Sequence, residues 1–274
     1  MEWVVNAGTL YVVATPIGNL EDMTYRAVRI LGEVDVIFAE DTRRARSLLS
    51  HYGLSYPEMG IQSCHDHNES KRIAALLSHL QQGRSVALVT DAGTPAISDP
   101  GYRLVQAVWQ SDARVVPLPG ACAAIAALSA GGLPTDRFTF AGFPPKKTGA
   151  RRRWLDELAT SPGTLILYAP ARDVAVVLSD LVEVRGDPPV AVFRELTKQY
   201  ETCLRGRASE VLQAWSQQPQ KGEVTLLAGR APDRDFDDAT LLAWLREASP
   251  AQVAQDTGVS RRRCYQLSLS LRDE

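Results

Sequence analysis

Short apolar runs rich in β-branched residues alternate with stretches of helical periodicity through the first half of the chain. The strand-like runs are residues 9–15, 34–40, 85–90 and 114–119. The helix-like stretches between them are residues 23–31, 43–53 and 68–83. Such alternation is typical of βαβ units, in which right-handed crossovers join parallel strands. It predicts an N-terminal α/β domain with a mainly parallel sheet.

Capping residues mark the ends of several expected helices. Asn68 stands where the N-cap of the third helix is expected, and Gly53 and Gly83 stand just past two helix ends. Asp99 precedes Pro100 and is expected to cap the helix that follows it. Asp41 could cap the second helix in the same way, or it could serve in a reaction.

The second half also alternates, but one pair of runs changes the expected sheet. Its strand-like runs are residues 138–143, 163–170, 188–196 and 221–229. The run at 188–196 is followed at once by a polar, strand-like 197–206, which favours an antiparallel hairpin and so a mixed sheet. A polar linker at 230–239 then leads to a helical tail. We therefore expect domains at 1–119 and 120–232, followed by the linker and tail at 233–274.

Composition excludes several classes of protein. The chain has 274 residues, a net charge of −2, 45% hydrophobic and 23% charged residues, values typical of a soluble globular protein. Its four cysteines show no CxxC spacing, which argues against a zinc site or a disulfide framework and fits a reducing cytoplasm. The early Glu2 and the lack of a basic segment at the N-terminus predict no signal peptide. The longest apolar stretch is expected to be too short to span a membrane.

Two loops rich in glycine and proline follow strand-like runs, namely 15-TPIGN-19 and 90-TDAGTPAISDPGY-102. Ligands of open α/β sheets bind outside the carboxyl ends of the strands. Gly93 has no Cβ, so a ligand can approach the backbone there, and the ring of Pro95 fixes the φ of that residue. Asp91 can accept hydrogen bonds from ligand hydroxyl or ammonium groups. The alternative is that both are ordinary β–α turns. No nucleoside triphosphate or dinucleotide fingerprint is present.

Longer motifs resemble one known family. TPIGNLEDMTYRAVRIL, AEDTR, HDHNE, VTDAGTPAISDPGYRLV, VPLPGACAAIAALSAGGLPTDRF, GFPPKK, RELTK and KGE occur in an order similar to that of the rRNA small-subunit methyltransferase I family. The resemblance covers roughly residues 8–271. It implies the two-domain tetrapyrrole-methylase fold, with a mainly parallel N-terminal sheet, a mixed C-terminal sheet and a small helical tail.

The resemblance also implies a cofactor, a substrate and an assembly. The cofactor is S-adenosylmethionine, held between the domains, and the reaction is methylation of the ribose 2′-oxygen of a cytidine in the decoding region of 16S rRNA. The partners are 16S rRNA or the small ribosomal subunit and a second copy in a homodimer, without metal or membrane, in the cytoplasm. The implied cofactor contacts are Pro16, Gly18, Asp91, Gly93, Thr94, Pro95, Ala121 and Ala123.

Methyl transfer to a ribose hydroxyl needs alignment and help with the departing proton. The candidate groups are Glu40, Asp41, His65, His67, Glu195, Lys198 and Glu223. We expect Glu195, Lys198 and Glu223 to be the catalytic residues, although 194-RELTK-198 could instead form a surface ion-pair cluster. The CHDH run at 64–67 lacks a distant partner motif, so no metal site is expected.

Basic residues on a near-neutral protein suggest contacts with RNA phosphates. The expected RNA contacts are Arg43, His65, His67, Lys146, Lys147, Arg151, Arg152, Arg261, Arg262 and Arg263. The tail suggests a helix-turn-helix whose second helix is capped by Ser260. The alternatives are solvated helix faces and a small helical cap.

One segment departs from the family pattern. Relatives usually carry Glu-Ser-Pro-His-Arg after the strand that ends at Tyr168, whereas this chain carries 169-APARD-173. A lost glutamate or histidine puts the catalytic assignment and the target nucleotide in doubt, while the loops expected to hold the donor are intact. Two rival functions therefore stay open: a tetrapyrrole C-methyltransferase of the same fold and a non-catalytic RNA-binding relative.

Overall fold

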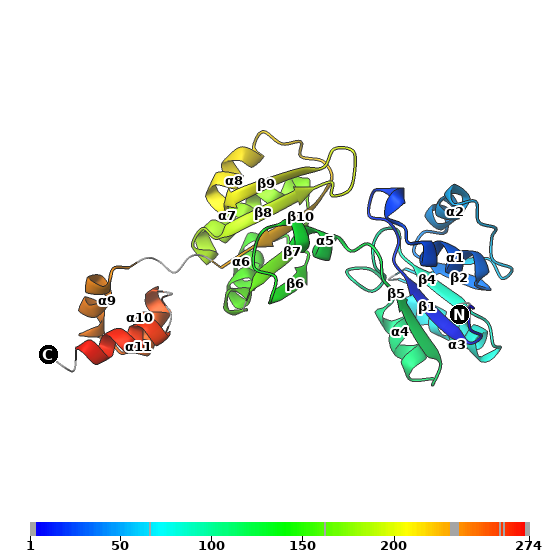
Figure 1. The fold of residues 1–274 in the computed structure, drawn as a ribbon, viewed down its shortest axis with the longest axis horizontal. Coiled ribbons are helices and arrows are strands. Elements are labelled where there is room, and N and C mark those ends of the chain that lie inside the picture. The colour runs from blue at the N-terminus through cyan, green and yellow to red at the C-terminus, as the bar shows by residue number, and fades with distance from the viewer. Residues whose placement is uncertain are drawn as a thin grey trace. The chain divides into compact units, whose positions relative to one another are not determined.

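The computed structural model in Figure 1 describes residues 4–65, 67–161, 163–230, 236–257, 259 and 261–271. The chain forms two compact units, each discontinuous in sequence. The first unit consists of Met1–Ala130, Phe193–Cys203 and Gly222–Thr225, and the second of Gly131–Val192, Leu204–Lys221 and Leu226–Glu274. The three-part division drawn from the sequence, with boundaries after residues 119 and 232, stays a prediction.

The sheet of the first unit has the strand order β3-β2-β4-β1-β5. Its strands are β1 (Thr9–Val13), β2 (Val36–Ala39), β3 (Ile61–Ser63), β4 (Val86–Val89) and β5 (Arg114–Leu118). All four neighbouring pairs are parallel, which confirms the predicted parallel sheet. Only β3, three residues long, was not predicted.

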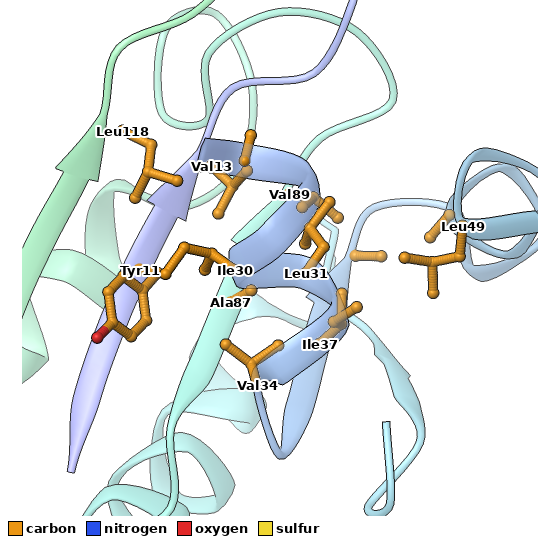
Figure 2. Packing of buried hydrophobic residues seen from close by; sticks show 13 residues of the cluster. Tyr11, Val13, Ile30, Leu31, Val34, Ile37, Leu49, Ala87, Val89 and Leu118 are labelled. Carbon is orange, nitrogen blue, oxygen red and sulfur yellow. The ribbon is translucent and has the colours of Figure 1, made fainter. Parts of the chain in front are cut away.

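Helices bury both faces of this sheet. They are α1 (Tyr25–Glu33), α2 (Thr42–His51), α3 (Glu69–Gln81) and α4 (Tyr102–Trp109). Helix α5 (Ala123–Ala130) follows β5. Tyr11 belongs to the core cluster that includes Ile30 and Leu31 of α1 (Figure 2), whereas its neighbour Leu10 belongs to the cluster with Leu76 and Leu104. Because successive strand residues face opposite sides, burial on both faces explains the unbroken apolar runs.

The second sheet has the strand order β6-β7-β10-β8-β9 and is mixed. Its strands are β6 (Phe138–Gly142), β7 (Thr164–Pro170), β8 (Pro189–Arg194), β9 (Thr202–Arg207) and β10 (Glu223–Ala228). The helices that accompany it are α6 (Thr148–Glu157), α7 (Val174–Arg185) and α8 (Ala208–Trp215). Strands β8 and β9 are neighbours, as the predicted hairpin requires.

The tail folds as three short helices with a small apolar core. They are α9 (Asp238–Leu245), α10 (Pro250–Thr257) and α11 (Arg261–Ser270). The core contains Leu241, Leu245, Val253, Val259 and Cys264. Helices α10 and α11 pack on each other in the predicted helix-turn-helix order. The predicted cap Ser260 lies outside the described residues.

The predicted helix caps have mixed outcomes. Asp41 is the N-cap of α2, where its Oδ1 accepts a 2.8 Å hydrogen bond from the amide of Arg43. Asn68 occupies the N-cap of α3 but makes no capping bond there, because its amide oxygen accepts from the amide of His65 at 2.8 Å. The prediction for Asp99 is wrong: α4 begins at Tyr102, with Gly101 as its N-cap.

Candidate active site

The loops after β1 and β4 are joined to each other by backbone hydrogen bonds. The amide of Thr15 donates to the carbonyl of Gly93 at 2.9 Å, and the amide of Gly93 donates to the carbonyl of Thr15 at 3.0 Å. Thr15 Oγ1 also donates to the carbonyl of Thr90 at 3.1 Å. The two predicted ligand loops therefore form one structure at the carboxyl edge of the sheet.

A third loop, after β5, joins the same assembly. Thr94 Oγ1 donates a 3.0 Å hydrogen bond to the carbonyl of Ala121, just before α5. Gly93 has a φ of +90°, and a Cβ there would lie 3.4 Å from Ile17 and 3.9 Å from the carbonyl oxygen of Ala121. Glycine at this position keeps the backbone in a left-handed conformation and leaves its surface bare. The two predicted loops, after β1 and β4, therefore meet a third loop, after β5.

Carboxylates connect the end of β2 to the end of β4. Glu40 Oε2 accepts hydrogen bonds from Thr90 Oγ1 at 2.8 Å and from the amide of Asp91 at 3.3 Å. Asp91 Oδ1 in turn accepts from the amide of Asp41 at 3.0 Å. Glu40 thus has a structural role, and both candidate carboxylates after β2 are occupied by local hydrogen bonds.

The pKa values of the two aspartates at this edge are shifted in opposite directions. Partial burial raises the pKa of Asp91, and the nearby carboxylate of Glu40 adds to the effect. Hydrogen bonds from the side chain and amide of Arg43 lower the pKa of Asp41 to about 2. Asp91 is therefore the better proton acceptor of the two.

A cavity of about 580 Å³ opens at this edge, within the first unit. It is lined by Thr15, Pro16, Ile17, Gly18, Leu20, Ala39, Asp41, Arg44, Ala45, Ser47, Leu48, His51, Val89, Thr90, Asp91, Ala92, Lys198 and Glu223. Three predicted cofactor contacts, Pro16, Gly18 and Asp91, line it. The other five, Gly93, Thr94, Pro95, Ala121 and Ala123, are not part of this lining.

Three predicted catalytic residues form one ion cluster at the rim of the cavity. Lys198 Nζ lies 3.0 Å from Glu195 Oε1 and 2.9 Å from Glu223 Oε2. Glu195 Oε1 also accepts a 2.9 Å hydrogen bond from the amide of Glu223. The side chain of Glu223 is 82% exposed, whereas those of Lys198 and Glu195 are 28% and 22% exposed.

The backbone around this cluster is strained. Glu195 and Thr197 adopt left-handed φ values of 54° and 68°. Gly222 has a φ of +104°, and a Cβ there would lie 2.6 Å from Glu195 Oε1. Non-glycine residues rarely adopt such angles, and they concentrate at functional sites. The strain supports a functional site rather than an incidental cluster of surface charges.

The cluster stabilises the charged forms of Glu195 and Lys198. Partial burial alone would raise the pKa of Glu195, but the amide of Glu223 and the ammonium of Lys198 outweigh it and lower that pKa. Burial alone would lower the pKa of Lys198, but Glu223 and Glu195 outweigh it and raise that pKa. The protonated, cationic form of Lys198 is therefore stabilised at this rim.

Comparison with known proteins assigns the family. The family model described as Tetrapyrrole (Corrin/Porphyrin) Methylases matches residues 9–212. The protein named ribosomal RNA small subunit methyltransferase I from Escherichia coli O157:H7 is 43% identical over 275 residues, 96% of this chain and 95% of its own. Its namesake from Synechocystis is 44% identical over 277 residues, 96% of this chain and 98% of its own. The chain belongs to the ribosomal RNA small subunit methyltransferase I family.

Solved structures support the fold of this methyltransferase. Uroporphyrin-III C-methyltransferase from Thermus thermophilus superposes with a TM-score of 0.56 at 21% identity, over 81% of this chain and 94% of that one. A cobalt precorrin-4 methyltransferase superposes with a TM-score of 0.59 at 19% identity, over 81% and 95% of the two chains. At these identities the likeness concerns the fold alone.

Residues of the edge fit the methyl donor of this methyltransferase family, S-adenosylmethionine. Gly93 leaves a space bounded by Ile17 and the Ala121 carbonyl that a Cβ would fill. A donor with a nucleoside and an amino-acid moiety can use the bare amides and carbonyls of such loops.

The predicted RNA contacts require one correction. Arg151 is only 5% exposed; its Nε donates to Asp180 at 2.7 Å and its Nη1 donates to the carbonyl of Lys146 at 3.0 Å. It is a buried structural ion pair, so its predicted RNA contact is wrong. Arg152 also binds Asp180, at 2.7 Å, and pairs with Glu183. A run of arginines in sequence did not show that a helix turns one of them inward.

The other predicted RNA contacts, apart from Arg262, are exposed or partly exposed. Arg43 is 87% exposed and pairs with Asp41 at 3.0 Å. The rings of His65 and His67 meet edge to face, with centroids 6.0 Å apart, while Lys146, Lys147 and Arg261 are exposed. Arg263 Nη2 lies 2.8 Å from Asp238 Oδ1. The side chain of Arg262 lies outside the described residues. These roles stay predictions.

The segment that departs from the family pattern lies at the end of β7. Ala169 and Ala171 are buried, at 3% and 1% exposure, so the small side chains are part of the core there. Arg172 is 74% exposed and lies 4.0 Å from Asp173. A mobile surface pair of this kind contributes little free energy and leaves Arg172 able to meet another anion.

Within the described residues, no cluster of three or more His, Cys, Asp or Glu side chains could hold a metal ion. The described helices are too short or too polar to cross a membrane. Cys64 and Cys264 are buried in core clusters.

Proposed function

We propose that this protein transfers the methyl group of S-adenosylmethionine to the 2′-oxygen of a cytidine ribose in the decoding region of 16S rRNA. The observation that carries the proposal is the cluster of Glu195, Lys198 and Glu223 at the rim of the cavity, in a chain whose full-length relatives are named for small-subunit rRNA methylation. The same relatives support S-adenosylmethionine as donor and rRNA as partner.

The chemistry assigns a different task to each member of the cluster. Bound S-adenosylmethionine supplies a methyl group activated by its sulfonium. Lys198, held cationic by two carboxylates, stabilises negative charge on the ribose oxygen as its proton leaves. Glu223 is the more exposed of the two carboxylates and would accept that proton. Glu195 has its oxygen bound by Lys198 and by the amide of Glu223, so it positions both.

The donor residues form the second part of the proposal. Pro16, Gly18, Asp91, Gly93, Thr94, Pro95, Ala121 and Ala123 all belong to loops that meet at one sheet edge. Support comes from the Thr15–Gly93 backbone pairing and the Thr94–Ala121 hydrogen bond, which fix these loops together. A preorganised edge lowers the entropy cost of aligning sulfur, methyl and oxygen.

The assembly and location are further parts of the proposal. We expect a homodimer in the cytoplasm, organised as 1–119, 120–232 and a tail from 233. The exposed basic residues, Lys146, Lys147 and Arg261 among them, are expected to contact rRNA phosphates.

A tetrapyrrole C-methyltransferase is the second candidate, since the solved neighbours share the fold. The full-length relatives favour rRNA, because they share more than 40% identity over nearly the whole chain, including the tail. Labelled methyl transfer to isolated small subunits, but not to a tetrapyrrole, decides between them. An absence of calorimetric heat with S-adenosylmethionine would favour the non-catalytic alternative.

Mapping ribose methylation on 16S rRNA, from cells with and without this protein, tests the nucleotide. Lys198→Met should abolish the modification, whereas Lys71→Met, on the exposed surface of α3, should leave it intact. Methylation that persists without the protein would contradict the proposal.

A further inference from the structure

The lining of the cavity leaves out five of the eight expected donor contacts. In the sheet order β2-β4-β1-β5, its walls come from the segments after β1, β2 and β4 and from α2. Gly93–Pro95 and Ala121–Ala123 follow β4 and β5 and are not part of its lining. A donor held by those five residues, with Pro16, Gly18 and Asp91 at the shared boundary, leaves the wall formed by α2 for another ligand.

One face of α2 forms a wall of the cavity. Arg44, Ser47, Leu48 and His51 all line it, and their spacing of three, four and seven places them on one helical face. None of the four was expected from the sequence to be a site residue. The opposite wall contributes the apolar Ile17 and Leu20, and Lys198 and Glu223 stand at the rim.

The charges of the lining suit a nucleotide. The carboxylates already have partners: Asp41 pairs with Arg43, Asp91 accepts from the amide of Asp41, and Glu223 pairs with Lys198. Arg44 is 67% exposed, and its Nε is 3.5 Å from Asp91, a loose contact that leaves its guanidinium open to a phosphate.

The size and polarity of the cavity agree with the same ligand class. A cavity of about 580 Å³ lies within the range of small-molecule pockets, and its apolar side chains with a few polar groups suit a flat base and a ribose. Sequence-specific RNA enzymes act on unstacked nucleotides that have left the helix. A single nucleotide swung out of the rRNA has the required shape.

We propose that this cavity binds the nucleotide whose ribose accepts the methyl group, with Arg44 against its phosphate and its base on Leu48. The inference rests on the proposed function and adds the acceptor subsite on α2. It places the ribose beside Lys198 and Glu223, at the boundary with the donor loops.

Ser47→Trp tests the cavity by filling it, and Ser50→Trp is the matched control. Both serines are exposed on α2, but only Ser47 lines the cavity. We expect Ser47→Trp to raise the KM for small subunits by at least about tenfold while the calorimetric Kd for S-adenosylmethionine stays within about twofold. Ser50→Trp should change neither value, and thermal unfolding of both variants checks that they fold.

Two results with Ser47→Trp would overturn the inference. A matching loss of S-adenosylmethionine affinity would make the cavity the donor slot, and unchanged values for both ligands would show that it binds neither. Failure of the wild-type protein to methylate small subunits would instead contradict the proposed function, so the two failures are distinguishable.

A second variant tests the phosphate contact by equilibrium binding, whether or not methyl transfer occurs. The slope of log K against log salt is negative, and Arg44→Gln should make it shallower for rRNA by about 0.7. This is the value for one phosphate contact to a single strand. Arg114→Gln removes the same charge at the start of β5, the opposite edge of the sheet, and should leave the slope unchanged. Equal slopes for Arg44→Gln and the wild type would refute the contact.

Discussion

The side chain of Lys198 lies directly against Gly18, so that a Cβ on Gly18 would overlap Cγ of Lys198. Gly18, in the loop after β1, therefore makes room for the side chain of Lys198, the cation of the ion cluster. The loop expected to contact the donor and the residues expected to handle the proton are thus in direct contact.

Gly18→Ala should displace Lys198 from Glu195 and Glu223 and lower kcat by about tenfold or more, since one misplaced charge-stabilising group has that effect. The rest of the fold should tolerate the change, because Gly18 is not among the glycines with a positive φ. Steady-state kinetics with small subunits and thermal unfolding measure the two effects.

A control and a double variant make this result specific. Gly149→Ala, in α6, meets nothing within 4 Å and should leave kcat unchanged. If Gly18→Ala acts through Lys198, adding it to Lys198→Ala should cause no further loss. Full additivity of the two changes would show that Gly18 acts on its own.

The ion cluster also predicts how stability depends on pH. The pKa of Glu195 is lower in the folded protein than that of an ordinary glutamate, because hydrogen bonds from the amide of Glu223 and from Lys198 outweigh partial burial. A lowered folded pKa contributes stability above the unfolded pKa, and this is lost as pH falls through the folded value. Glu195→Gln should therefore show a shallower fall in Tm than the wild type between about pH 5 and pH 3.

Glu58→Gln is the matched control for this measurement, since Glu58 lies on an exposed turn. It should follow the wild-type profile. A Glu195→Gln profile parallel to the wild type would show that Glu195 gains nothing from Lys198 and the Glu223 amide.

Patterns of local sequence predicted most of the first sheet and the meeting of its loops. Buried strands such as β1 and β4 read as unbroken apolar runs because helices cover both faces. Strand β3 was missed because three half-buried residues carry no detectable period. Arg44, Ser47 and His51 were not selected as site residues, because nothing in the sequence shows which face of α2 meets a cavity.

Long-range contacts of charged residues escaped the sequence analysis for a related reason. Glu69 is only 6% exposed, and its Oε1 accepts 3.0 Å hydrogen bonds from the amides of Gly101 and Arg103. These amides belong to the start of α4, the place assigned from the sequence to an Asp99 cap. A cap supplied from 32 residues away leaves no local signal.

Removing this distant cap should destabilise the loop before α4. Glu69→Ala leaves two amides without their acceptor and should cost about 2 kcal/mol or more of unfolding free energy. Glu69→Gln keeps one oxygen for the same amides and should cost less. Urea unfolding measures both, and Ser70→Ala, which removes a surface bond from Arg103, should cost no more than about 1 kcal/mol.

An equal cost for Glu69→Gln and Glu69→Ala would contradict this account. It would mean that the carboxylate charge, rather than the acceptor oxygen, matters at the start of α4. In that case the ionised form would be the stabilising element, and the effect would disappear at low pH.

Arg151 and Asp180 form a buried ion pair. Both side chains are buried, at 6% and 2% exposure, and Arg152 reaches the same carboxylate from the surface. Removing one partner of a buried pair leaves an uncompensated charge, so Asp180→Ala should lose about 3–5 kcal/mol of stability. Arg152→Gln, at a side chain 42% exposed, should lose no more than about 1 kcal/mol.

The same pair separates folding from RNA binding. Arg151→Gln should lower Tm strongly, yet the folded fraction should bind rRNA with the wild-type salt slope, because a buried guanidinium releases no counterion from a phosphate. A salt slope that becomes shallower by about 0.7, with Tm unchanged, would show that Arg151 does contact RNA. It would also require α6 to turn that side chain outward.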